Sequence, residues 1–264
     1  MSLPAGQLPV GQILAESWRL LLGQPGAWCR AMLIPLVIEL AVTYGFLSLY
    51  GPQLAAMTMG NPQDIDTPTM LRFLGMQICL LIAYVLFAVA WHRFTLIGPS
   101  EAPRALPTVQ RRHMRFLATT IGVALLIGLA VMVPLMIIAA LRVQSALVLI
   151  GVMILVFVLL VRWQLVFPAI AVERPLSLVA SWRATRGHGF WLFWLLVLAV
   201  LPGVVVGFLL DQVFGAAQQL FVAFGTLSVP AALGYLASSL VSYATLAIAV
   251  SAVSGAYRRL VDGG

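Results

Sequence analysis

Long apolar runs separated by short polar connections dominate the pattern along this chain. Six of these runs approach or exceed the length of about 20 residues that a helix needs to cross a hydrocarbon layer of about 30 Å. They lie near residues 27–50, 70–97, 115–141, 143–167, 190–211 and 229–257. Transmembrane strands are shorter and alternate in polarity, which excludes a barrel. The pattern therefore predicts an all-α integral membrane protein, with six transmembrane helices in one bundle and a single domain over residues 1–264.

Two further stretches have amphipathic spacing typical of helices that lie along a membrane surface. In residues 10–22 the apolar side chains share one helical face, while Glu16 and Arg19 lie elsewhere. We expect an interfacial helix there, with Trp18 at headgroup depth, ending at the Gly- and Pro-containing segment 23–26. Residues 213–224 repeat this spacing. They predict a separate outer interfacial or re-entrant helix before the sixth span.

The composition agrees with a membrane protein and excludes two other classes. Hydrophobic residues make up 62% of the 264 residues and charged residues 9%, against roughly 25% charged in soluble domains. A disordered chain would need low hydrophobicity and high net charge. Cys29 and Cys79 form no spacing motif, so we expect neither a disulfide nor a metal site from them.

Arginine placement predicts the orientation of the bundle. All fifteen basic residues are arginines, and thirteen fall on one side of the predicted topology, leaving Arg72 and Arg142 for the other. Positively charged connections stay in the cytoplasm, so both termini should be cytoplasmic. The expected partner of this charge is the anionic inner leaflet. Nucleic acid is not expected, because its recognition needs a basic, water-exposed face.

A short motif recurs before the first and fifth spans. Ser17-Trp18-Arg19 with Gly23 is matched by Ser181-Trp182-Arg183 with Gly187, and each odd-numbered span contains one proline. These features favour three pseudo-repeats, near 9–97, 99–167 and 173–260, each an interfacial helix followed by a helical hairpin. Interfacial anchoring alone would also enrich tryptophan and arginine at these places. The predicted anchors are Trp18, Arg19, Trp91, Arg93, Trp182, Arg183, Tyr257 and Arg258.

Glu39 is the main candidate for an intramembrane polar site. It lies twelve residues into the first predicted span, which is roughly 18 Å of helix rise and therefore near mid-membrane. A carboxylate at that depth is costly unless it is paired or protonated. By depth, its expected neighbours on the sixth span are Ser239, Ser242, Tyr243 and Thr245. Two interpretations stay open: a protonated structural hydrogen bond between helices, or a proton- or substrate-linked role.

Other chemistry has little support in the sequence. His92, His113 and His188 have no histidine or carboxylate partner at helical spacing, so no metal site is expected. The chain has neither a glycine-rich phosphate loop nor a nucleophile elbow. We therefore expect no cofactor and no enzymatic activity.

One region resembles a known family. Residues 162–168, followed by Glu173-Arg174-Pro175 and then by Ser181-Trp182-Arg183-Ala184-Thr185-Arg186-Gly187, resemble the segment before the fifth span of YciC-like bacterial six-span proteins. A similar unit is the membrane domain fused to some glycerophosphodiester phosphodiesterases. The resemblance implies an inner-membrane protein of poorly defined biochemistry. The phosphodiesterase catalytic domain has no counterpart here.

Three functions remain open at this point. The first is a non-catalytic polytopic protein that interacts with lipids, other membrane subunits or itself, indicated by the arginine-rich inner rim. The second is a transporter or permease for an apolar or amphiphilic substrate, indicated by Glu39 and the prolines. The third is an accessory subunit of a larger membrane complex.

Overall fold

The computed structural model describes residues 8–59, 67–104, 106, 108–140, 146–174 and 176–263. Within these ranges the secondary structure is helical and no strand occurs. The helices are α1 (Val10–Gly23), α2 (Pro25–Met59), α3 (Thr67–Ile97), η2 (Pro99–Glu101), α4 (Arg111–Ala140), α5 (Ala146–Trp163), α6 (Val166–Ala171), α7 (Leu178–Ala184), α8 (Gly189–Phe224), α9 (Val229–Tyr257) and η3 (Arg258–Asp262).

Six segments of the described chain are long and apolar enough to cross a membrane: α2, α3, α4, α5 continuing into α6, α8 and α9 continuing into η3. The predicted all-α membrane bundle is therefore confirmed. The prolines of the odd-numbered spans, Pro35, Pro134 and Pro202, lie inside helices. The tight connection predicted at 141–144 lies outside the described residues.

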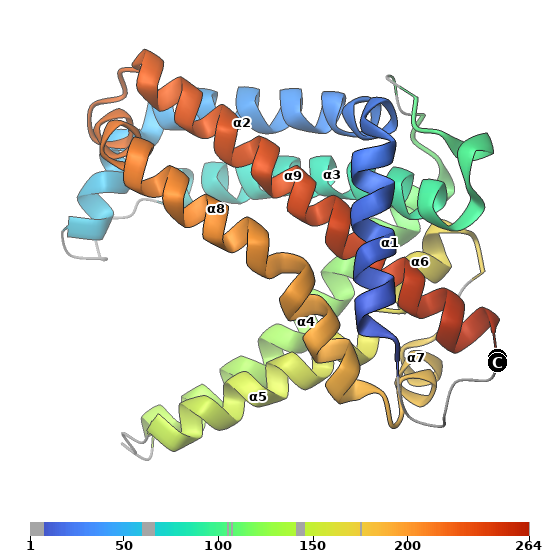
Figure 1. The fold of residues 1–264 in the computed structure, drawn as a ribbon. Helices are drawn as coiled ribbons and strands as arrows, with labels where there is room; N and C mark the ends of the chain where they lie inside the picture. Colours follow the sequence, from blue (N-terminus) through green and yellow to red (C-terminus); the bar gives the residue numbers. More distant parts are fainter. Residues whose placement is uncertain are drawn as a thin grey trace.

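The spans form two groups that meet at one end and diverge at the other. In Figure 1, α4 and α5 leave the end that carries α6 and α7 and point away from α2, α3 and α9, while α8 crosses from one group to the other. Only 6% of the most apolar stretch of α4 is buried within the protein, against 39% for α9. The α4–α5 hairpin therefore exposes most of its apolar surface.

The close packing of α8 against α9 depends on a glycine. A Cβ atom at Gly203 would overlap the side chain of Thr245 on α9, whereas one at Gly207, a turn later, would meet nothing within 4 Å. Small residues let membrane helices approach closely, where dispersion forces and hydrogen bonds replace the hydrophobic effect. Gly203 thus marks the tight contact, and beyond it the space over Gly207 is open.

The N-terminal helix forms as expected and lies across the bundle. α1 ends at Gly23, the first residue of the segment predicted to stop it, and in Figure 1 it runs crosswise to α2. Its buried side chains are Ile13, Ser17 and Leu21. A salt bridge of 2.8 Å joins Glu16 to Arg259 after α9. The buried face of α1 therefore packs on protein.

The separate outer helix expected at 213–224 is wrong. α8 continues without interruption from Gly189 to Phe224 and ends at Gly225, which has the left-handed backbone that favours glycine (φ +68°). No glycine or proline separates Leu210 from Val213, so nothing stops the helical hydrogen bonding there. The apolar spacing of this segment instead packs Phe221, fully buried, against Tyr44 of α2 and Tyr235 of α9.

Candidate functional site

The Glu39 side chain on α2 has the polar neighbours expected at the middle of α9, but only two of the four. The Ser239 hydroxyl donates a hydrogen bond of 2.7 Å to the Glu39 carboxylate. The Tyr243 hydroxyl is a second polar neighbour of the same carboxylate. Both α9 side chains are buried, 6% and 4% exposed, because they are four residues apart and share the helix face turned to α2 and α3.

Ser242 and Thr245, which were also predicted to face Glu39, line a different surface. They belong to a groove of about 570 Å³ between α8 and α9, together with Gly207, Asp211 and Ser238. At 100° per residue, positions 242 and 245 are rotated by about 60° and 120° from position 239. Ser242 and Thr245 therefore lie apart from the Glu39 carboxylate, although they were expected at the same depth in the membrane.

Two of the predicted interfacial anchors are enclosed by protein, which corrects their role. Trp91 is 0% exposed and Tyr257 2%. The Trp91 indole donates to the Ala247 carbonyl and the Ser251 hydroxyl, both at 2.9 Å. A side chain without exposed surface cannot reach lipid headgroups, so these aromatics stabilise the bundle from inside. The anchor role stays a prediction for Trp18, Arg19, Trp182, Arg183 and Arg258, of which Trp18 is half-buried and the others exposed.

Arg93, another predicted anchor, is held by an acidic partner. Its guanidinium makes two hydrogen bonds to Glu101 in η2, of 2.8 and 3.2 Å, and a third of 3.0 Å to the Ala171 carbonyl. The hydrogen bond from Arg93 keeps the pKa of Glu101 below its ordinary value, and the nearby charges of Arg112 and Arg104 act in the same direction. This pair joins α3, η2 and α6 at the end of the bundle where α4 begins.

The recurring Ser-Trp-Arg motif has a specific structural role in its second copy. Ser181 donates a hydrogen bond of 2.6 Å to the carbonyl of Arg162 at the end of α5. The Arg162 guanidinium lies 5.1 Å from the centre of the Trp182 ring and donates to the Thr185 hydroxyl at 3.4 Å. Gly187, at φ +81°, then allows the turn into α8. The motif therefore connects α5 to the start of α8.

The first copy of the motif makes different contacts. The Ser17 hydroxyl donates a hydrogen bond of 2.8 Å to the Ile13 carbonyl within its own helix. Ser17 is nevertheless buried, like Ser181. The serine of the motif is thus buried in a helix in both copies, but the two serines have different hydrogen-bond partners. The threefold repeat and its boundaries stay a prediction.

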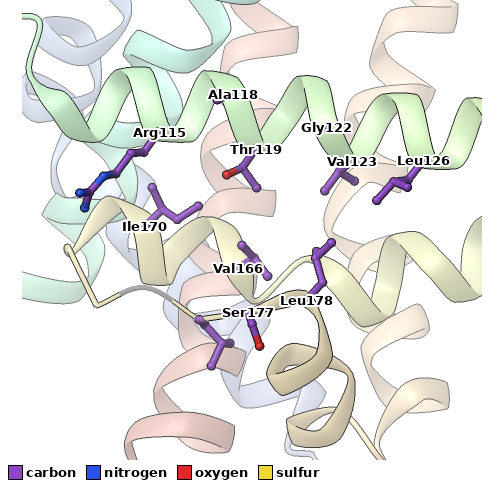
Figure 2. Close-up of a pocket in the computed structure, with 11 residues that line it drawn as sticks. Arg115, Ala118, Thr119, Gly122, Val123, Leu126, Val166, Ile170, Ser177 and Leu178 are labelled. Carbon is purple, nitrogen blue, oxygen red and sulfur yellow. The ribbon is translucent and has the colours of Figure 1, made fainter.

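A groove of about 680 Å³ lies between α4 and the segment from α6 to α7. Figure 2 shows Arg115 at one end of the α4 face and Leu126 at the other, with Val166 and Ile170 of α6 opposite. Between Arg115 and Val123, the α4 residues that line the groove are small: Ala118, Thr119 and Gly122. A Cβ atom at Gly122 would meet nothing within 4 Å. The sequence already places Arg115, Thr119, Gly122 and Leu126 at helical spacing on one face of α4. It does not show which segment packs against that face.

Metal chemistry has no candidate in the described ranges, which contain no group of three or more His, Cys, Asp and Glu side chains able to hold an ion.

The fold defines the chain as a polytopic α-helical membrane protein. Comparison with family models, with curated proteins and with solved structures finds no match for this chain. The resemblance to YciC-like proteins therefore stays a prediction, carried by the motif residues alone.

Proposed function

We propose that this protein is a non-catalytic polytopic protein of the bacterial cytoplasmic membrane, with both termini inside, that associates laterally with phospholipids. The groove of Figure 2 carries the proposal. It is lined mainly by apolar side chains, and its charged residue, Arg115, lies at one end. An amphiphile with an anionic headgroup has the same distribution of charge and apolar length.

The dimensions of the groove fit one leaflet. Arg115 and Leu126 are eleven residues apart on α4, which corresponds to a rise of about 16 Å. That is about half of a hydrocarbon layer of about 30 Å. A headgroup at Arg115 would thus leave its acyl chain along Thr119, Gly122 and Leu126.

The contacts of Glu39 favour this function over transport. A transport site would bring the carboxylate to a cavity that a substrate can enter. Glu39 instead accepts a hydrogen bond from Ser239 on α9, and it is not among the lining residues of the grooves at Arg115, Arg162 and Ser242. We infer that Glu39 is a structural link between α2 and α9.

A subunit-binding role is the second candidate, and the exposed α4–α5 hairpin favours it. An apolar helix of which 6% is buried can be covered by lipid or by another membrane helix. Intramembrane crosslinking through a cysteine at exposed Leu125 distinguishes these cases. A crosslinked species containing a second polypeptide supports a subunit, and crosslinks to lipid alone support the first proposal.

The test uses the full chain in nanodiscs doped with a phospholipid that carries a photoreactive acyl chain. We expect crosslinks, mapped by mass spectrometry, to concentrate at residues 118–126, 166–170 and 176–178. Gly122→Leu fills the groove and should reduce them at least threefold. Gly128→Leu is the matched control, because Gly128 is on the same helix, also has open space around it and does not line the groove. Even labelling of α4, unchanged by Gly122→Leu, would contradict the proposal.

A further inference from the structure

A second apolar groove lies between α5 and α8, where the two helices separate. It consists of two adjoining hollows of about 410 and 320 Å³ that share Phe157, Val161 and Phe193. Along α8 it extends from Gly189 to Val204, a rise of about 22 Å. An extended acyl chain has a similar length to this groove.

The charged side chain of this groove lies near one end. Arg162, at the end of α5, lines the larger hollow together with Gly189, whereas Gln164 lines the smaller one. The remaining lining residues are apolar: Ile154, Phe157, Val158, Leu160, Val161, Phe190, Phe193, Leu196, Val197, Val200, Leu201 and Val204. The groove therefore has one cationic end and an apolar interior.

The Arg162 guanidinium is positioned but not neutralised. Trp182 stacks on it at 5.1 Å and Thr185 accepts one hydrogen bond at 3.4 Å. The missing side chain at Gly189 leaves room for it, since a Cβ there would lie 3.4 Å from Arg162 Nη2. No carboxylate among the described residues forms a salt bridge with it. Most of its five N–H donors thus remain free for an anion.

We propose that this groove is a phospholipid site, with the phosphate bound by Arg162 and one acyl chain between α5 and α8. The inference rests on the proposed lateral association with phospholipids and names a second place where it occurs. Arginine matches a phosphate because its planar donors can form two parallel, charge-assisted hydrogen bonds. The Trp182 ring and Thr185 hold those donors at the mouth of the groove. The Ser181–Gly187 motif therefore contributes to the headgroup site.

The test measures lipid retention by the full chain in mild detergent, using native mass spectrometry after adding phosphatidylglycerol to delipidated protein. We expect Arg162→Gln to weaken retention roughly tenfold, the loss that one charge-assisted hydrogen bond implies. Val200→Phe, which narrows the apolar part of the groove, should weaken it as well. Arg111→Gln is the matched control, because Arg111 is exposed at the start of α4 and lines neither hollow. It should retain lipid like the unchanged protein.

Two results would overturn the site. One is retention unaffected by both Arg162→Gln and Val200→Phe in protein that elutes as a single species. The other is preferential retention of oleate over phosphatidylglycerol, which would identify a fatty acid rather than a phospholipid. The crosslinking experiment with the photoreactive lipid at the α4 groove distinguishes a failure of this site from a failure of the proposed function. Persistent labelling there leaves lateral lipid association intact, whereas loss of labelling at both grooves contradicts it too.

Discussion

The Ser239 hydroxyl of α9 donates a hydrogen bond of 2.7 Å to the Glu39 carboxylate of α2, joining residues 200 positions apart in the chain. Ser239 and Tyr243 are buried, while Glu39 itself is half-buried, so these two side chains shield the carboxylate only in part. A carboxyl group in the apolar region is costly without such partners. This contact therefore explains how the chain accommodates an acid in the middle of its first span.

Removing either partner should measure that contact. Ser239→Ala should lower the free energy of unfolding by about 0.5–2 kcal/mol, the range of interhelical hydrogen bonds in membranes. Glu39→Gln keeps an acceptor oxygen and should stay close to the unchanged protein, whereas Glu39→Leu should not. A double-mutant cycle of Glu39→Leu and Ser239→Ala in a detergent unfolding titration gives the coupling. A coupling of zero would show that the hydrogen bond contributes nothing.

Gly203 and Gly207 provide a matched pair for the α8–α9 contact. Gly203→Ala places a methyl group against Thr245, and we expect a loss of about 1–3 kcal/mol from overpacking. Gly207→Ala adds the same group where there is open space, so its stability should change little. Thermal unfolding in detergent, monitored by the amount of protein that still elutes as a monodisperse species, measures the stability of both variants. Equal changes at the two positions would contradict a close approach at Gly203, because the higher helix propensity of alanine acts alike at both.

The Arg93–Glu101 pair predicts a dependence of stability on acid. Since the hydrogen bond from Arg93 lowers the pKa of Glu101 in the folded protein, its contribution is present at neutral pH and disappears as the pH falls through the carboxyl range. The Glu101 side chain is 39% exposed, so we expect the contribution to stay below about 1 kcal/mol.

Unfolding temperatures between pH 7 and pH 3.5 test this contribution. Arg93→Gln should reduce the change of the unfolding temperature with pH. Arg104→Gln should reduce it less, because Arg104 acts on Glu101 only through its charge. The expectation is wrong if Arg93→Gln leaves the pH profile unchanged.

The orientation of the bundle can be tested with reporter fusions. The ends of α3, α5 and α9 and the beginnings of α4 and α8 share one end of the molecule with α1 and α7 (Figure 1). A reporter inserted near Arg112 should be cytoplasmic, and one inserted at 225–228, between α8 and α9, should be periplasmic. The connection at 225–228 suits an insertion because it lies between two helices. The opposite result would reverse the topology.

The sequence by itself determined the six apolar helices, the stop at the end of α1 and the part of α9 that lies level with Glu39. Those properties follow from local quantities: the length of an apolar run, the helical period, Gly and Pro at helix ends, and depth counted in residues. The orientation follows from arginine counts in the same way and awaits its test.

Only the tertiary structure decided which way each helix faces. Membrane-spanning helices that are apolar all round carry no stripe to set their rotation. Depth alone therefore could not separate Ser239 from Ser242, and it could not show that Trp91 lies inside the bundle. The grooves beside Arg115 and Arg162 depend on how far neighbouring helices diverge. That distance is set by small residues on one helix meeting side chains on another, and no single segment of the chain contains it.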